Sequence, residues 1–333
     1  MCQKHLKRDV LINLFCQEGT PMRMAVLWLL MLAAVVLSPL AWAQSGRVNE
    51  SGTRSYSINA ILQPIPDESG LPPLKGVESA DPIPIPKNQV AVYEAGIEQE
   101  IQGFRSDVSG ARYVLLVDNS QNVQAQTADM ERATRAIAKE IFVGDQVMVV
   151  GYNESPEIIE DFTDDGKKLV EAGKLFAKRK PPRLFDALAA VVEDALRSQI
   201  STSKRVILLF SDGYDSGSQY TYDQTLELLQ TENIVVYVLQ CSDRTFGAPR
   251  AKKLGPKPTI VAKELAEGTG GRVFSMEESL AAMKIITDEV RNRWYVLSYA
   301  PKGVNLTISR RLLLSLNDNK YSLRTKQQQP AGH

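Results

Sequence analysis

The feature that most constrains this chain is an alternation of apolar strand patterns and amphipathic helix patterns across residues 112–292. The apolar runs are short and nearly continuous, and the segments between them have apolar residues at helical spacing. Strands that are apolar on both faces need cover on both faces, which parallel sheets obtain from their crossover helices. The alternation therefore predicts a Rossmann-like, doubly wound α/β domain around a six-stranded, mainly parallel sheet.

The elements of this domain are predicted from the same patterns. The expected strands are Tyr113–Val117, Val147–Val150, a short one near Ile158, Val206–Phe210, Ile234–Leu239 and Arg272–Phe274. The expected helices are Thr127–Phe142, Gly166–Ala177, Leu184–Arg197, Thr225–Thr231, Ala262–Glu267 and Leu280–Asn292. Open α/β sheets bind their ligands at the carboxyl edge of the strands, where strand order reverses. We therefore expect the functional site at that edge.

The segments on either side carry short β patterns instead. They are Tyr56–Ile61, Gln89–Tyr93 and Gln99–Phe104 before the domain, and Trp294–Tyr299, Arg311–Leu316 and Lys320–Arg324 after it. Seven prolines between residues 64 and 86 predict an extended insertion. We expect both flanks to form one small β domain. The predicted boundaries are a leader at 1–43, an N-terminal β segment at 44–109, the central domain at 110–293, C-terminal strands at 294–326 and a disordered tail at 327–333.

The N-terminus carries the pattern of an export signal. Arg23 precedes the apolar run Ala25–Leu37, and the small-x-small triplet Ala41–Ala43 follows. This order is typical of a signal peptide, cleaved here before Gln44. An uncleaved membrane anchor is the alternative, since residues 25–43 approach the roughly 20 needed to span a bilayer. We expect an exported protein, periplasmic or secreted, whose translation starts at Met1, Met22 or Met24.

Charge and residue counts exclude several classes of function. Lys+Arg and Asp+Glu each number 39, so no global field draws the chain to nucleic acid or to an anionic membrane. After residue 43 the only cysteine is Cys241, which rules out an internal disulfide. The two histidines, His5 and His333, lie in the leader and at the last residue. Without a central imidazole, most hydrolase mechanisms and His-ligated zinc sites are excluded, and we expect no enzyme and no small-molecule cofactor.

Oxygen-bearing side chains gather directly after the first central strand. Asp118, Ser120 and Asn122 alternate along a tight strand-to-helix turn. Hard oxygen ligands spaced in this way can converge on a small cation such as Mg²⁺. The pattern resembles the opening of the metal-ion-dependent adhesion site of von Willebrand factor type A (VWA) domains, where the family has Asp-x-Ser-x-Ser.

Two later segments extend the resemblance. Phe210–Gly213 follows an apolar strand, and its Asp212 matches the final Asp of the family's site. Leu184–Leu188 is similar to the family's Leu-Tyr-Asp-Ala-Leu, but Pro182 stands where the family has Thr. The resemblance implies a degenerate site for Mg²⁺ or Mn²⁺, with candidate ligands Asp118, Ser120, Asn122 and Asp212. Alternatively, Asp118 and Ser120 only cap the first helix.

A narrower resemblance concerns the segments around the central domain. Val90–Phe104 and Trp294–Pro301 resemble phrases that flank the domain in secreted bacterial "VWFA-related" proteins. The family implies no catalytic activity, and it favours protein binding or adhesion in the cell envelope or outside the cell. A structural subunit of an envelope assembly, without metal dependence, is one alternative. A phosphatase of the haloacid dehalogenase type is another, but it needs a second carboxylate where Ser120 stands.

Basic loops are expected beside this site. Arg183 ends a basic loop next to Pro182, and Arg244 lies in the long loop between residues 241 and 258. We hypothesise that these cations pair with Asp118 and Asp212 or receive an acidic group from an unknown protein partner. Asp186, in the segment that resembles the family's Leu-Tyr-Asp-Ala-Leu, is also expected to contact that partner. The alternative is that these are solvated loop charges, which contribute little.

Overall fold

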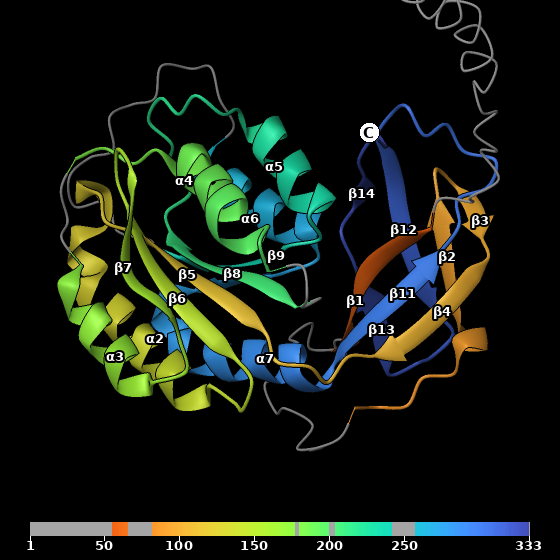
Figure 1. The fold of residues 1–333 in the computed structure, drawn as a ribbon, viewed down its shortest axis with the longest axis horizontal. Helices are drawn as coiled ribbons and strands as arrows, with labels where there is room; N and C mark the ends of the chain where they lie inside the picture. The colour runs from red at the N-terminus through yellow and green to blue at the C-terminus, as the bar shows by residue number, and fades with distance from the viewer. Residues whose placement is uncertain (1–54, 66–81, 177–179, 200–203, 242–256, 333) are drawn as a thin grey trace, which may run out of the picture. The chain divides into compact units, whose positions relative to one another are not determined.

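The computed structural model describes residues 55–65, 82–176, 180–199, 204–241 and 257–332. These residues form three sheets (Figure 1). One has six strands and is covered by helices, and the other two are antiparallel and have four strands each. The predicted leader at 1–43, the centre of the proline-rich insertion and Arg244 lie outside the described residues. None of the helices within the described ranges is long and apolar enough to cross a membrane.

The central sheet confirms the predicted doubly wound architecture. Its order is β10 (Val273–Ser275), β9 (Val235–Gln240), β8 (Arg205–Ser211), β5 (Arg112–Asp118), β6 (Gln146–Tyr152) and β7 (Pro156–Thr163). Every neighbouring pair is parallel except β6 and β7, which are antiparallel. The strands alternate with helices on both faces, as sheets with two apolar faces require.

Side-chain alternation along the strands divides the core into two clusters. Along β5, Tyr113, Leu115 and Val117 face one cluster, whereas Val114 and Leu116 face the other. The first cluster is covered by α2 (Thr127–Glu140), α3 (Gly166–Ala172) and α7 (Ser279–Asn292). The second is covered by α4 (Leu184–Ala190), α5 (Tyr222–Thr231) and α6 (Pro258–Thr269) (Figure 1). Because successive strand side chains point to opposite faces, one apolar strand serves both clusters.

Helix caps set boundaries that apolar periodicity alone does not predict. The side chains of Thr221 and Gln224 form a capping box, so α5 begins three residues before the predicted Thr225. Pro258 occupies the first turn of α6, and the helix ends at Gly270 in a left-handed conformation with φ 89°. Both helices are therefore longer than predicted, because cap residues are polar or conformationally special and do not belong to the apolar stripe.

The flanking segments form two antiparallel sheets that share one core. One has the order β13 (Tyr321–Arg324), β1 (Tyr56–Pro64), β11 (Trp294–Tyr299) and β4 (Ile101–Ser106). The other has the order β14 (Gln328–Gln329), β12 (Arg310–Leu316), β2 (Val90–Glu94) and β3 (Ile97–Gln99). Ile58, Val92, Leu297 and Leu312 are buried in that core. Strands from before and after the central domain therefore pair directly, as the fold-class prediction states.

β2 forms a tight hairpin whose second strand begins before the strand predicted at Gln99–Phe104. Val90–Glu94 turns through Ala95 and Gly96 and pairs with Ile97–Gln99. The strand predicted at Gln99–Phe104 is found at Ile101–Ser106 and belongs to the other sheet, where it pairs with β11. The tight two-residue turn fixes the hairpin register, so the chain must change sheets at Glu100.

The C-terminal tail also differs from its prediction. Residues 327–333 were predicted to be disordered, but Gln328–Gln329 forms β14 against β12. The Gln327 amide donates to the Gly268 carbonyl at 3.0 Å, and its carbonyl accepts from the Leu312 amide at 2.8 Å. A polar tail without an apolar pattern resembles a disordered one in sequence. Here backbone hydrogen bonds, which leave no mark in hydropathy, order the segment.

Candidate functional site

The candidate site lies where the carboxyl ends of β5 and β8 meet. The two strands are parallel neighbours with Val117 opposite Phe210, so Asp118 ends one strand and Asp212 directly follows the other. From β5 the chain continues to β6 on one side, whereas β8 lies on the opposite side. Strand order therefore reverses at this point, which is where open α/β sheets bind their ligands.

The turn after β5 orders its own polar groups. Asp118 and Ser120 are fully buried. The Ser120 amide donates to Asp118 Oδ1 at 2.7 Å, and the Asn122 amide donates to Ser120 Oγ at 3.3 Å. These are the bonds expected of helix capping, and they fix both oxygens in place. A carboxylate and a hydroxyl each have further lone pairs for another ligand.

The loop after β8 is fixed by hydrogen bonds within the loop and by packing against α6. The Tyr214 amide donates to the Oδ1 atom of the half-buried Asp212 at 2.8 Å. Ser211 Oγ accepts from the Gly213 amide at 3.0 Å. Gly213 has φ 81°, and a Cβ atom there would lie 2.1 Å from the carbonyl oxygen of Pro258. Only glycine therefore allows the loop to pack this closely against the start of α6.

Tyr152, the last residue of β6, forms the floor of the site. Its buried hydroxyl donates to Ser211 Oγ at 2.8 Å. Burial first, and then the negative charge of Asp118 with a smaller effect from Asp212, raises the pKa of Tyr152 well above its usual value. Both carboxylates are thus near the tyrosine, which stays protonated. Tyr152 is not among the site residues predicted from the sequence, because its place depends on the register that sets it opposite Asp118.

The loop before α4 closes the site with a residue that offers no side-chain ligand. Pro182, at the position of the family's Thr, is buried. Backbone hydrogen bonds join this loop to its three neighbours: Gln121 N to Lys180 O at 3.2 Å, Arg183 N to Asn153 O at 2.8 Å and Ser216 N to Pro182 O at 2.7 Å. The loop therefore lies beside the turn after β5, where the sequence predicted it, but Pro182 itself contributes only a backbone contact.

Arg183 and Asp186, which were predicted to contact a partner, have different surroundings in the structure. Arg183 is half-buried at the N-cap position of α4. Lys180, which hydrogen-bonds to Glu154, and the more distant charge of Arg183 lower the pKa of that glutamate. Asp186 Oδ1 accepts from the amides of residues 219 and 220 at 2.8 and 2.9 Å. Asp186 thus holds a neighbouring loop, and one of its oxygens is engaged within the fold.

The donor set at the strand ends fits an oxygen-ligated divalent cation. Asp118, Ser120 and Asp212 supply two carboxylates and one hydroxyl from adjacent turns. Asn122 Nδ2 is buried and has no hydrogen-bond partner among the described residues, and rotation of the amide would bring its oxygen to that position. The described residues contain no group of three or more His, Cys, Asp and Glu side chains that could hold a metal. Neutral ligands and water would therefore complete the coordination.

Comparisons with known proteins identify the central domain. The family model of the von Willebrand factor type A domain matches residues 113–214, which include the ends of both β5 and β8. No curated protein matches the chain.

Several solved structures are similar to part of the chain. An aerotolerance-related membrane protein from Bacteroides fragilis is 18% identical with a TM-score of 0.42, over 54% of this chain and 98% of that one. A von Willebrand factor type A protein from Catenulispora acidiphila is 11% identical with a TM-score of 0.45, over 77% and 74%. Mussel byssus proximal thread matrix protein 1, with a zinc-occupied adhesion-site motif, is 14% identical with a TM-score of 0.43, over 56% and 49%. This chain thus spans about half the length of the mussel protein.

The family match and the strand order agree on the same part of the chain. Residues 113–214 run from β5 past the end of β8, and so include the strand reversal and both carboxylates of the site. The six-stranded sheet extends the same architecture to β9 and β10. The protein therefore contains a von Willebrand factor type A domain.

Proposed function

We propose that this protein is an exported binding module of the adhesion type, which holds a protein partner at the carboxyl edge of its VWA sheet. VWA domains are in general interaction modules and not enzymes. The observation that carries the proposal is the meeting of Asp118 and Asp212 above the buried hydroxyl of Tyr152. Two carboxylates at a strand reversal, fixed by backbone amides, form a preorganised acidic site.

In this proposal Asp118, Ser120, Asn122 and Asp212 hold Mg²⁺ or Mn²⁺. When bound, the cation supplies a positive charge that attracts an acidic group of the partner. Tyr152 keeps its proton and fixes Ser211 from below the site. Pro182 provides no ligand, so the site has one protein oxygen fewer than the family pattern and we expect weaker cation binding. Arg183 borders the site and would add positive charge toward the same acidic group.

A second candidate is a structural subunit of an envelope assembly that needs no cation. The buried Pro182 at the position of the family's Thr favours it, because the loop contributes no side-chain oxygen there. Stable co-purification with one partner in the presence of EDTA would distinguish this candidate from reversible, cation-dependent adhesion. Under both candidates the N-terminal export pattern supports a periplasmic or secreted location.

The test is thermal unfolding of the protein with EDTA, Mg²⁺ or Mn²⁺, repeated on Asp118→Ala. We expect the midpoint to rise with cation in the wild-type protein only, since a ligand that binds only the folded state adds about 2.7 kcal/mol at 100 times its Kd. Glu154→Gln is the matched control, because this acid lies beside the site but outside the donor set. Identical wild-type curves with and without cation would contradict the metal-dependent proposal.

A further inference from the structure

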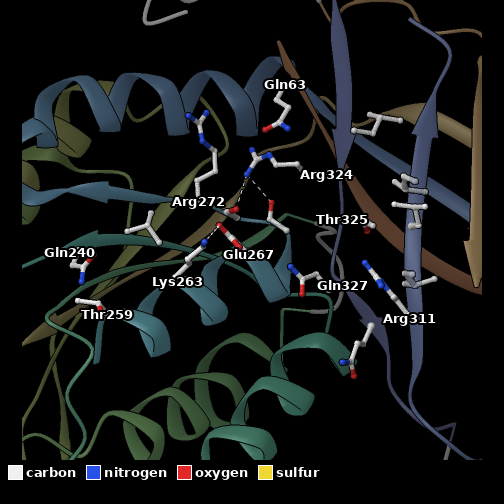
Figure 2. Close-up of a pocket in the computed structure, with 18 residues that line it drawn as sticks. Gln63, Gln240, Thr259, Lys263, Glu267, Arg272, Arg311, Arg324, Thr325 and Gln327 are labelled. Atoms are coloured by element: carbon white, nitrogen blue, oxygen red, sulfur yellow. Dashed lines mark hydrogen bonds and ion pairs between the residues drawn. The ribbon is translucent and has the colours of Figure 1, made fainter. Parts of the chain in front are cut away.

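A second candidate site lies in a cleft between the VWA domain and the flanking strands. It has a volume of about 980 Å³ and is lined by α6 and β10 on one side and by β12, β13 and β14 on the other. Figure 2 shows Lys263, Arg272, Arg311 and Arg324 around this space. None of these residues belongs to the donor set at the ends of β5 and β8.

The edge strands of all three sheets contribute to the cleft. β10, β13 and β14 are each the terminal strand in the order of their sheet. Val273, Leu323 and Gln328, one residue from each strand, line the same space. The edge of a sheet presents backbone groups that can pair with another extended chain. The cleft is therefore built for a ligand that is itself a strand.

The geometry of β10 shows which backbone groups are available. Val273 pairs with Val238 of β9, and the Val238 amide donates to the Arg272 carbonyl at 3.0 Å. In a parallel ladder this pattern turns the amide and carbonyl of Val273 away from β9. Within the described part of the chain, neither group has a hydrogen-bond partner. Val273 thus offers one donor and one acceptor along the cleft.

The opposite wall offers apolar and charged contacts. Arg311 and Leu313 alternate with buried residues along β12, and both are exposed. Leu313 is 57% exposed, so β12 leaves a large apolar side chain uncovered beside the cleft. An arginine and a leucine at strand spacing suit a ligand that alternates acidic and apolar side chains.

The charge of the cleft selects for acidic ligands. Its lining has four cationic side chains and one carboxylate, Glu267. Behind it, Glu289 accepts from Arg272 Nη1 at 2.9 Å and from Arg324 Nη2 at 2.5 Å, which fixes both arginines. Arg311 forms no ion pair with the residues that the structure describes. The positive excess therefore lies on the wall that faces the open edge of β10.

We propose that this cleft binds an extended acidic peptide segment of a partner protein, which adds as a strand to β10. Its backbone pairs with the amide and carbonyl of Val273. Its acidic side chains lie against Arg311 and Lys263, and its apolar side chains cover Leu313. The site is independent of the cation site at the carboxyl edge of β5 and β8.

The first experiment measures fluorescence anisotropy of a labelled octapeptide that alternates valine and glutamate, titrated with the full chain in EDTA. We expect binding that weakens as salt rises, because exposed charges are screened. A peptide that alternates valine and lysine should not bind. The acidic peptide with N-methyl groups on alternate amides should bind at least tenfold more weakly, since it cannot pair with a strand edge.

Variants of the protein locate the binding. Arg311→Glu should weaken binding at least tenfold, whereas Arg105→Glu, on an exposed arginine outside the cleft lining, should not. Val273→Pro removes the outward amide without removing an existing hydrogen bond, because proline is tolerated where the strand amide is unpaired. It should abolish binding, with Val273→Ala as its control. If Val273→Pro does not fold, the N-methylated peptide tests the same pairing on the wild-type protein.

Four outcomes would overturn the proposal. The first is an absence of binding by the acidic peptide. The second is equal binding of the N-methylated peptide, which would mean charge recognition without strand addition. The third is displacement by citrate at the concentration of the peptide, which would indicate a small-anion site. The fourth is loss of binding in Asp118→Ala with Arg311→Glu unaffected, which would assign the peptide to the carboxyl edge instead.

Discussion

The two candidate sites of this protein are built in opposite ways. At the carboxyl edge of β5 and β8, carboxylates gather, and each comes from a residue next to the end of a strand. In the cleft, cations gather from α6, from the residue before β10, and from β12 and β13. The first arrangement follows from local chain geometry, whereas the second exists only because distant strands meet. Opposite charge then predicts opposite ligands, a cation at one site and an acidic peptide at the other.

The interactions that hold the two sites in place also differ in charge. A neutral hydrogen bond between Tyr152 and Ser211 underlies the carboxyl edge. A buried ionic cluster underlies the cleft, in which Glu289 contacts Arg272, Arg324 and the hydroxyl of Tyr237. Ionic clusters respond strongly to loss of a charge, whereas neutral hydrogen bonds respond weakly. The comparison therefore predicts that charge and pH perturb the cleft more than the edge.

The largest expected effect is that of Glu289→Leu. Burial by itself would raise the pKa of Glu289, but Arg324 and Arg272 outweigh it and hold that pKa below its usual value. Without the carboxylate, two half-buried arginines lose their charge partner, which should lower the free energy of unfolding by up to about 3–5 kcal/mol in chemical denaturation. Glu267→Gln removes the exposed pair with Lys263, 3.8 Å apart, and should cost less than about 0.5 kcal/mol. Equal losses of stability in the two variants would contradict the stronger role of the buried ionic cluster.

The next effect is a pH dependence carried by Lys326, whose Nζ donates to the Gln230 carbonyl at 2.8 Å beside the cleft. Burial lowers its pKa to about 7, partly opposed by Glu94. Above pH 7 the folded lysine has lost the proton that the unfolded chain keeps up to about pH 10, so stability rises with pH in this window. The slope from Lys326 alone should reach about 1.4 kcal/mol per pH unit at most.

Denaturation at pH 6 to 9 measures this slope directly. Lys326→Met should remove most of it and stabilise the protein at neutral pH, because the Lys326 amine no longer has to be buried with a charge. Lys204, whose pKa burial lowers to about 8, should retain a smaller slope of the same sign. The exposed Lys320→Met serves as the control and should leave the profile unchanged. A Lys326→Met profile parallel to the wild type would refute the assignment.

The third effect in order of size is tighter cation binding at the carboxyl edge. Pro182→Thr would restore a hydroxyl at the position of the family's Thr and should tighten Mn²⁺ binding about tenfold, or about 1.4 kcal/mol, in calorimetry. Loss of the proline should cost about 0.4–1 kcal/mol of stability. Pro181→Thr is the matched control, with the same loss of rigidity one position away. Equal affinities of the two variants would show that residue 182 does not face the cation.

The smallest effect expected is that of Tyr152→Phe. It removes one buried hydrogen bond to Ser211 and should lower stability by about 1 kcal/mol, without altering peptide binding in the cleft. Tyr220→Phe, on a hydroxyl 3.3 Å from Glu193 at the surface, should change stability far less. A loss above about 3 kcal/mol for Tyr152→Phe would mean that the edge depends on more than a neutral bond.

The outline of the fold could be predicted because it is encoded locally. Apolar runs such as Tyr113–Val117 and Val206–Phe210 predict a buried strand without reference to the rest of the chain. Both form central strands in the structure. The same locality located Asp118 and Asp212, since a residue directly after a buried strand must lie at the sheet edge. Helix starts such as Thr221 were less accurate, because capping depends on hydrogen bonds and not on hydropathy.

By itself, the sequence determined the doubly wound sheet, the pairing of both flanks in β layers and the acidic carboxyl edge, since periodic hydrophobicity and strand ends are local properties. Only the tertiary structure decided the strand at Gln328–Gln329 and the position of the Tyr152 hydroxyl. It also brought Arg272, Arg311 and Arg324 to one cleft. These features depend on which distant segments pair, and backbone pairing across a long loop leaves no periodic trace in the side chains.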